Sequence, residues 1–283
     1  MISKLQSTKT KNQIKAVDIF SYKYMILLVI LTFSFISIFG LSSCTEGKSI
    51  ENKSVEEIYN EALELFNKDN LYDAKKFFDV IKLQYPASSY ADDAQYYLAE
   101  IEYKNEKYIM SSFNFNLIKK LYPNSIFVKE AQFKSALCYY KLSPGFERDL
   151  EYTKKAITAF NEFQNLYPED SLSKESDTYI KELRNNLAAR EYKIGTLYQK
   201  LTSPKASLIY FDSIINDYDD SDYLERAYLG KIEVLVFMSK YDNAKTIIDL
   251  YKQKFPNGEF KSEVSNLEAN INQNKNNNKA LKN

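Results

Sequence analysis

The hydrophobic positions along this chain recur with the period of an amphipathic α-helix, and the clearest unit is Leu71–Pro86 (LYDAKKFFDVIKLQYP). Its apolar residues fall at i, i+3, i+4 and i+7, on one face of a helix: Ala74, Phe77, Phe78 and Ile81. Lysines and aspartates occupy the opposite face. Pro86 has no N–H and disfavours helical geometry at Tyr85, so the helix is predicted to end there.

The same pattern returns four more times. Each later copy closes on an aromatic residue that is followed, with one exception, by proline: Tyr122-Pro123, Tyr167-Pro168, Tyr218-Asp219 and Phe255-Pro256. The closing aromatics are 37, 45, 51 and 37 residues apart, which leaves room for a second helix before each unit. We therefore predict an all-α chain of about five helix pairs, over residues 54–86, 89–123, 127–168, 172–219 and 221–256.

The spacing of small and bulky residues within these pairs is typical of tetratricopeptide (TPR) repeats, whose period is near 34 residues. In that pattern a small residue on the first helix is followed by a small residue 12 positions later and an aromatic after 4 more. Two triplets follow it: Ala62, Ala74 and Phe78, and Gly195, Ser207 and Phe211. Small side chains let paired helices approach closely, and the aromatic fills the space beside them. The predicted fold is a superhelical solenoid, with an unrelated helical bundle as the alternative.

The third and fourth pairs depart from the regular spacing. Ala136 and Ala156 are 20 residues apart, so the third pair carries an insertion of eight residues, which includes the Ser-Pro-Gly-Phe run at 143–146. The first helix of the fourth pair is extended, over about 172–201. These two features account for the longer intervals in the middle of the chain.

Polar segments flank the predicted solenoid of residues 54–269. Residues 44–53 have nothing to bury and are predicted to form a flexible tether of at most about 30 Å. Ser54 and Glu57 have the spacing of a capping box, which marks the first helix start. Residues 258–269 are spaced for a short capping helix. Residues 270–283 are mostly Asn and Lys, so we predict a disordered tail.

The first 43 residues have the composition of a secretory signal peptide. Lysines precede an uncharged stretch of 17 residues, Met25–Leu41, and small residues then lead to Cys44. The ending Leu-Ser-Ser-Cys resembles the lipobox of bacterial lipoproteins, whose cysteine becomes the lipidated first residue of the mature chain. The alternatives are an ordinary cleaved signal and an uncleaved signal anchor, for which 17 residues is at the short limit. We predict lipid attachment at Cys44, with Met1 or Met25 as the translation start.

The residue types present restrict the chemistry. The chain has no His, which excludes His-based acid–base catalysis, Ser-His and Cys-His nucleophile pairs, and His metal ligands. No phosphate-binding loop, nucleophile elbow or metal-spaced cysteine pair is present. The acidic run Asp219–Asp222 is interpreted as a solvated turn, and Cys138 as a buried free thiol. The chain has no formal net charge overall, and without residues 1–43, which hold five lysines and one aspartate, 33 basic and 37 acidic groups remain, a net charge of −4 that argues against nucleic-acid binding. We predict no enzymatic activity, no cofactor and no metal.

Binding to other polypeptides is the function that the predicted fold favours. The concave face of such a solenoid is lined by first helices and accepts extended peptides or helices. Exposed aromatics on that face would serve as anchors. The weak candidates on first helices are Tyr59, Tyr96, Tyr97, Tyr103, Arg184 and Arg190. The alternative for the tyrosines is packing between repeats, and for the arginines ion pairs with neighbouring acidic residues.

From the lipobox to about residue 260 the chain resembles the BamD family, lipoproteins of the outer-membrane β-barrel assembly (BAM) machinery. The order of lipobox, tether and five repeats agrees, and so does the recurring Tyr-Pro pair. The most specific match is in the middle of the chain: Arg148-Asp149, Ala156–Phe163 (AITAFNEF), Leu166-Tyr167-Pro168 and Leu183–Ala188 (LRNNLA) through Glu191. These segments resemble the family's linker into its long fourth-repeat helix.

The resemblance implies a lipid-anchored scaffold on the periplasmic face of the outer membrane, without chemistry of its own. The family's C-terminal repeats contact the central barrel component, and its N-terminal repeats receive unfolded outer-membrane proteins. The missing proline at Asp219 and the asparagine-rich tail depart from the family near the first of these interfaces. The alternative functions are a lipid-anchored adaptor for cell-wall synthesis, division or a secretion pore, and, third, an envelope enzyme.

Overall fold

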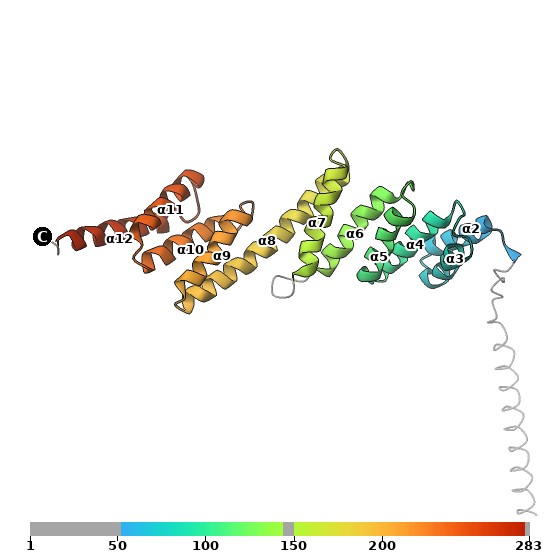
Figure 1. The fold of residues 1–283 in the computed structure, drawn as a ribbon, viewed down its shortest axis with the longest axis horizontal. Helices are drawn as coiled ribbons and strands as arrows, with labels where there is room; N and C mark the ends of the chain where they lie inside the picture. Colours follow the sequence, from blue (N-terminus) through green and yellow to red (C-terminus); the bar gives the residue numbers. More distant parts are fainter. Residues whose placement is uncertain (1–51, 144–149, 281–283) are drawn as a thin grey trace, which may run out of the picture. The chain divides into compact units, whose positions relative to one another are not determined.

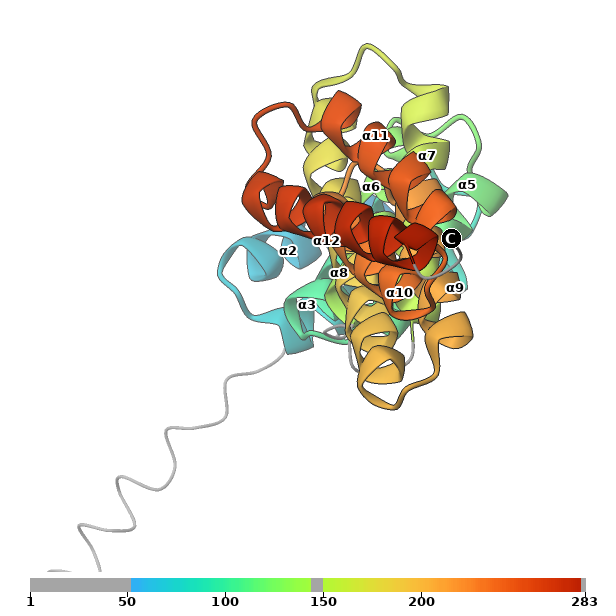
Figure 2. The same ribbon diagram turned by 90° about the vertical axis from the view of Figure 1, so that its left-hand side faces the viewer.

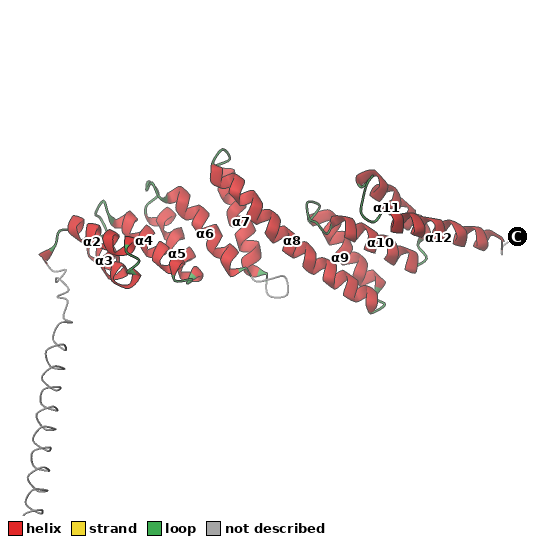
Figure 3. Cartoon of the chain, turned by 180° about the vertical axis from the view of Figure 1, so that it is seen from behind, coloured by secondary structure: helices red, strands yellow, loops and turns green. Residues whose placement is uncertain are grey.

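The computed structural model describes residues 52–143 and 150–280 of the chain. Within these ranges there are eleven α-helices and no β-strand (Figure 3). The chain divides into two units, Met1–Asn52 and Lys53–Asn283, and the helices belong to the second. The predicted signal peptide, Cys44 and most of the tether lie outside the described residues, as do most of the insertion and residues 281–283.

The helices pair in chain order, and each pair corresponds to one of the repeats expected from the sequence (Figure 1). The pairs are α2 (Val55–Asn67) with α3 (Leu71–Gln84), α4 (Ala91–Lys104) with α5 (Tyr108–Leu121), α6 (Val128–Leu142) with α7 (Glu151–Leu166), α8 (Ser171–Lys200) with α9 (Pro204–Asp217), and α10 (Leu224–Phe237) with α11 (Tyr241–Lys254). Each helix packs against the next one in the chain. The prediction of an all-α solenoid of about five helix pairs is confirmed.

The second helix of every pair ends in the same way, on the aromatic residue that closed each sequence unit. These C-cap residues have φ of −127°, −130°, −134°, −132° and −124°: Tyr85, Tyr122, Tyr167, Tyr218 and Phe255. The geometry at Tyr218 matches the others although Asp219 replaces proline there. The aromatic C-cap, rather than the proline, is therefore the shared feature of the stop.

Four of the first helices end in a common turn whose C′ residue is left-handed but is not glycine. The residues are Asp69, Glu106, Thr202 and Ser239, with φ between 53° and 59°. In the last turn of α8, Thr202 N–H bonds Gln199 O (3.1 Å) and Ser203 N–H bonds Tyr198 O (2.9 Å). This is the Schellman arrangement, which satisfies carbonyls left free at a helix end.

The small residues of the repeat pattern lie where paired helices approach most closely. Ala62, Ala74 and Phe78 are fully buried. In two repeats the second small residue is a serine that donates to the carbonyl of the first: Ser111 Oγ to Ala99 O (2.9 Å), and Ser207 Oγ to Gly195 O (2.8 Å). The hydroxyl is therefore satisfied in a contact too tight for a larger side chain.

The spacing pattern also survives the insertion in the third repeat. Ala136 and Ala156 are both fully buried and share one hydrophobic cluster with Phe160. The insertion therefore does not change which side chains of α6 and α7 meet. The inserted segment thus lengthens the connection and keeps the helix pair intact.

The 30-residue helix α8 contributes to two separate hydrophobic clusters. Toward its N-terminal end, Tyr179 and Leu183 pack with Phe160 of the third repeat. Further along, Ala188 and Tyr192 pack in the cluster of the fourth and fifth repeats. The long helix is therefore shared between the third repeat and the repeats that follow it (Figure 1).

The C-terminal helix differs from the sequence expectation. α12 (Lys261–Ala280) lies against α10 and α11 (Figure 2) and extends well beyond the predicted capping helix at 258–269. Residues 270–280, for which the sequence predicts disorder, are helical. The physical reason is Ile271, which is fully buried in the last cluster with Val264 and Tyr251. Together with Val264 and Leu267, Ile271 keeps α12 docked as far as this residue.

Candidate protein-binding groove

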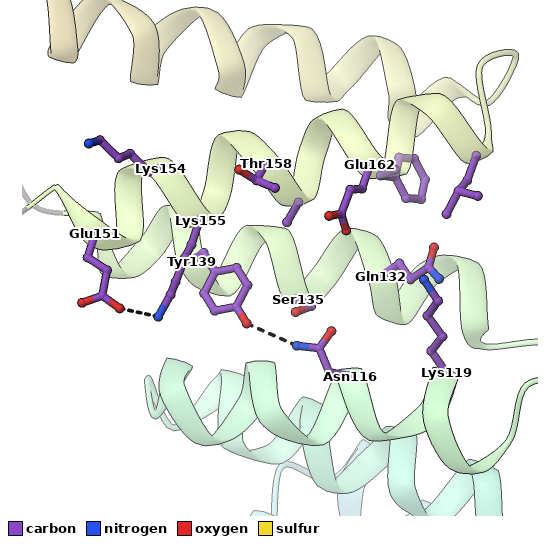
Figure 4. A pocket seen from close by; sticks show the side chains of 13 residues that line it. Asn116, Lys119, Gln132, Ser135, Tyr139, Glu151, Lys154, Lys155, Thr158 and Glu162 are labelled. Carbon is purple, nitrogen blue, oxygen red and sulfur yellow. Dashed lines mark hydrogen bonds and ion pairs between the residues drawn. The ribbon is translucent and has the colours of Figure 1, made fainter.

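A groove with a volume of about 490 Å³ lies between α5, α6 and α7, in the second and third repeats (Figure 4). Its lining combines polar, charged and apolar side chains from all three helices: Asn116 and Lys119; Gln132, Ser135 and Tyr139; and Glu151, Lys154, Lys155, Thr158, Ala159, Glu162, Phe163 and Leu166. We call this the α5–α7 groove. It combines one first helix, α6, with second helices on both sides.

Two buried oxygen atoms on α6 face this groove without a hydrogen-bond partner among the described residues: Ser135 Oγ and Gln132 Oε1. Ser135 is only 3% exposed. A buried polar group without a partner costs about 1–3 kcal/mol. A ligand that donates hydrogen bonds to these two oxygens would remove that cost, and backbone N–H groups of a polypeptide are suitable donors.

The rest of the groove is held in place by contacts among its own side chains. Asn116 Nδ2 donates to the hydroxyl of Tyr139 (3.3 Å), and Lys155 forms an ion pair with Glu151 (2.5 Å). Near the other end Leu166 is 54% exposed. The groove is therefore lined on α6 by two residues whose buried side-chain oxygens have no partner among the described residues, and on α7 by an exposed apolar side chain.

The sequence-predicted tyrosines lie elsewhere, in contacts between successive first helices. Tyr59 OH donates to Asp93 Oδ1 (3.0 Å), and Tyr96 OH donates to Glu130 Oε1 (2.6 Å). Burial raises the pKa of both phenols, and their carboxylate partners raise it further. Tyr96 is only 6% exposed. Both rings thus join one repeat to the next.

Tyr97 and Tyr103 also pack within the repeats. The ring of Tyr97 stacks on Phe78, with centroids 5.1 Å apart, and Tyr103 meets Tyr108 edge to face at 5.4 Å. Burial raises the pKa of Tyr103 to about 12. The four candidate anchors therefore occupy packing positions, and the structure brings none of them into the α5–α7 groove.

Arg184 on α8 is held by the turn between α9 and α10. Its guanidinium donates to both carboxylate oxygens of Asp220 (2.6 and 2.8 Å) and to Asp217 O (2.8 Å). This hydrogen bonding lowers the pKa of Asp220. Arg190 lies half-buried further along α8, beside Glu191. Arg184 thus occupies the structural ion pair that was the alternative to partner binding.

The acidic run forms the predicted turn, but two of its carboxylates bind side chains of α8, and the cysteine is buried and free as predicted. Asp220 is bound by Arg184, and Asp222 exchanges two hydrogen bonds of 2.9 Å with Asn185. Cys138 is fully buried, its thiol donates to Ser111 Oγ (3.3 Å), and burial raises the pKa of Cys138 to about 11. A thiol with so high a pKa is a poor nucleophile at neutral pH.

Metal-binding clusters and membrane spans were sought in the described part of the chain. Residues 52–143 and 150–280 contain no group of three or more acidic or cysteine side chains placed to bind a metal ion. No helix in the same ranges combines the length and the apolar character that crossing a bilayer requires. The candidate lipid-attachment residue, Cys44, lies outside these ranges.

Sequence reasoning missed the α5–α7 groove because its lining comes from three helices. Gln132 and Ser135 are one turn apart on α6, among the buried residues Ala131, Phe133 and Ala136. The sequence did contain one indication of this site, namely two polar residues at positions flanked by core residues. Their orientation toward a groove became clear only with α5 and α7 in place.

Sequence comparison finds relatives that align with about two thirds to three quarters of this chain. The outer membrane protein assembly factor BamD of Rickettsia prowazekii is 24% identical over 213 residues, covering 75% of this chain and 85% of the relative. BamD of Caulobacter vibrioides is 21% identical over 195 residues, covering 69% of this chain and 64% of the relative. A tetratricopeptide repeat protein of Parabacteroides merdae covers 77% of this chain and 72% of its own, with 17% identity and a TM-score of 0.34.

The family comparison covers the helical region almost from its start. The model of the YfiO family, described as outer membrane lipoprotein, matches residues 51–250. This range includes the first four helix pairs and most of the fifth. The chain therefore belongs to the YfiO family of outer membrane lipoproteins, the family of the assembly factor BamD.

Proposed function

We propose that this chain is a TPR scaffold for outer-membrane protein assembly, anchored by a lipid on Cys44 to the periplasmic face of the outer membrane. The names of its relatives support the assembly role, because the curated proteins that it resembles are outer membrane protein assembly factors. In this role it belongs to the BAM complex and helps to insert proteins into the membrane without catalysing a reaction.

The α5–α7 groove is the proposed site for client polypeptides. The observation that carries this proposal is the pair of buried acceptors, Ser135 Oγ and Gln132 Oε1, which have no partner among the described residues. An extended client would donate backbone N–H groups to these oxygens and place apolar side chains against Leu166. Such recognition depends on the backbone N–H groups of the client more than on its side chains. It would therefore suit a scaffold that binds many different unfolded proteins.

The C-terminal repeats are the proposed contact with the central barrel component of the complex. Exposed apolar side chains at this end support a protein contact: Leu197 on α8, Leu201 at the C-cap of α8, Ile209 on α9 and Phe237 on α10, each more than half exposed. Large apolar patches on a surface mark protein interfaces, and these side chains come from three helices that pack against one another. Partner and client would then occupy different repeats.

The decisive experiment is a pull-down in mild detergent with a tag after Asn283, read by mass spectrometry. We expect a barrel protein with periplasmic domains in near-equal amount, together with unfolded outer-membrane proteins. Recovery of cell-wall enzymes or a secretion pore in place of the barrel protein would favour the adaptor function.

A matched pair of variants separates client binding from partner binding. Leu166→Glu places a charge at an exposed position of the groove and should reduce client recovery while the barrel protein is retained. Leu83→Glu, on α3 and 77% exposed outside the groove, is the control and should change neither. Equal client recovery with both variants would remove the groove from the proposal.

A further inference from the structure

The outward side of α5 is apolar, and more than half of each of its large side chains is exposed in the described part of the chain. Ile109, Met110, Phe113 and Leu121 lie on this side and are 60%, 51%, 57% and 52% exposed. Positions 109, 113 and 121 recur at intervals of four or eight residues, so they share one side of the helix. We call these four residues the α5 apolar face. They lie on the second repeat, beside but not within the α5–α7 groove.

The charges on α5 are all of one sign. The helix sequence YIMSSFNFNLIKKL contains no Asp or Glu, and its basic residues are Lys119 and Lys120 in the last turn. Every other helix in the described ranges contains at least one acidic residue. An exposed apolar helix face beside a lysine and without a carboxylate is one feature of helices that lie in the interface of a lipid bilayer. Anionic headgroups attract the lysines, and no acidic side chain on α5 repels them.

The position of this face along the chain also favours a membrane. Lys53 is already fixed to the solenoid, because it forms an ion pair with Glu61 of α2. The chain between Cys44 and Lys53 therefore reaches at most about 30 Å even when fully extended. If Cys44 carries the lipid, as the proposed function holds, Lys53 and the start of the first repeat stay within that distance of the bilayer. So short a tether gives any apolar face nearby a high effective concentration of lipid.

We propose that the α5 apolar face lies in the interfacial layer of the membrane to which the protein is anchored. Phe113 and Ile109 insert at the boundary between headgroups and acyl chains, and Lys120, on the same side of α5, contacts lipid phosphates. The lipid on Cys44 and the side of α5 together form two points of attachment. They fix how the second repeat faces the membrane, which a single flexible tether does not.

The absence of tryptophan from the chain makes the test direct. Phe113→Trp introduces a single indole on the α5 apolar face, and Phe237→Trp introduces one at an exposed position of the last repeat. Full-length lipidated protein is purified in detergent and reconstituted into phosphatidylethanolamine–phosphatidylglycerol vesicles. Half of the preparations contain lipids brominated along the acyl chain, which quench indole on contact. Circular dichroism verifies that both variants keep the wild-type helix content.

The indole emission of the Phe113→Trp variant is expected to fall by about half or more in brominated vesicles, since interfacial helices bury their apolar face to acyl-chain depth. The emission of the Phe237→Trp variant should not change. If both variants sediment with vesicles and the indole of Phe113→Trp is not quenched, the proposal is overturned while the lipid anchor stands.

Two other outcomes would also overturn the proposal, each for a different reason. Failure of either variant to sediment with vesicles would show that the anchor itself is wrong, and the inference, which rests on that anchor, would fall with it. If lipid does not quench the indole of Phe113→Trp but an added unfolded outer-membrane protein shields it from a soluble quencher, the α5 apolar face binds clients instead.

Discussion

The ring of Phe211 packs directly against the backbone of Gly230, so that a Cβ built on Gly230 would stand 2.6 Å from Cζ of the ring. The same ring also contacts Gly195, where a Cβ would stand 3.0 Å from Cε1. Phe211 is fully buried and belongs to the cluster that joins α8, α9 and α10. Because both glycines pack against the same ring, the ring cannot move away from one glycine without moving toward the other.

Gly230→Ala is expected to lower the free energy of unfolding by about 1–3 kcal/mol through overpacking. This sign is informative, because glycine to alanine inside a helix is otherwise stabilising by about 1 kcal/mol. Gly195→Leu should be at least as damaging, whereas Gly195→Ala should cost less because its contact is longer. Urea unfolding followed by circular dichroism measures all three. A Gly230→Ala variant as stable as the wild type would contradict this packing of Phe211.

Thr202→Gly is expected to stabilise the protein. Thr202 is exposed and has φ of 53°, in the left-handed region that costs an L-residue about 1–2 kcal/mol. Glycine removes that cost but loses some of the gain to its more flexible unfolded state, so a net gain of about 0.5–1 kcal/mol is expected. Ser203→Gly, one residue on with φ of −108°, is the control and should not stabilise. Thermal unfolding of the two variants decides between these outcomes.

Stability is expected to fall steeply in alkali. Burial raises the pKa of Tyr103 to about 12, and burial together with an acidic partner raises the pKa of Tyr140 and Tyr179 to about 12. The unfolded chain ionises its tyrosines near pH ~10, at a lower pH than the folded one. The stabilisation is thus complete below about pH 10 and is lost as the pH rises from about 10 to 12.

Urea midpoints measured between about pH 8 and 12 test this expectation. Tyr103→Phe cannot ionise at this position, so its midpoint should fall less steeply with pH than that of the wild type. Tyr72→Phe provides the control, because Tyr72 is 73% exposed. Parallel curves for Tyr103→Phe and the wild type would show that Tyr103 does not contribute.

Ile271→Ala is expected to detach the end of the solenoid. Removing a fully buried isoleucine side chain costs about 2–5 kcal/mol, and this one anchors the second half of α12 in the last cluster. Hydrogen exchange should therefore accelerate in α12 and α11 while α2 to α7 stay protected. Deleting residues 281–283 is the control and should leave exchange unchanged. Uniform exchange in the variant and the wild type would mean that α12 is not docked.

Cys44→Ala is expected to release a folded protein from the membrane. The prediction rests on the lipobox-like sequence, because this residue lies outside the described ranges. Carbonate washing of membranes, followed by immunoblotting of pellet and supernatant, measures the release. A variant that stays in the pellet would favour an uncleaved signal anchor over the lipid.

Local chemistry explains why the helix pairs could be predicted from the sequence. Tyr85 before Pro86 stops a helix, and Ala62 and Ala74 allow close approach, whatever the rest of the chain does. The end of α12 could not be predicted in this way. The amino-acid composition of residues 270–280 is typical of a disordered segment. Ile271 nevertheless packs in a cluster formed with residues of α10 and α11, and composition does not predict that contact.

The candidate site was harder to predict for a different reason. Tyr59 and Tyr96 resemble exposed anchors in the sequence, yet each reaches an acidic residue 34 positions later on the next first helix. Which acidic residue a tyrosine hydroxyl reaches depends on the distance between successive repeats. The residues around the tyrosine do not determine that distance. Likewise, the sequence does not show that Ser135 and Gln132 line a groove, because the groove forms only when α5 and α7 pack beside α6.

The length of α8 affects how the repeats unfold. In a chain of independent repeats, unfolding proceeds from either end one repeat at a time. A helix of about 45 Å that is packed into two clusters removes the boundary between them. Breaking α8 at any point exposes the cores of both the third and fourth repeats. The third and fourth repeats are therefore expected to unfold together, whereas the first two repeats and the C-terminal helices α11 and α12 can fray separately.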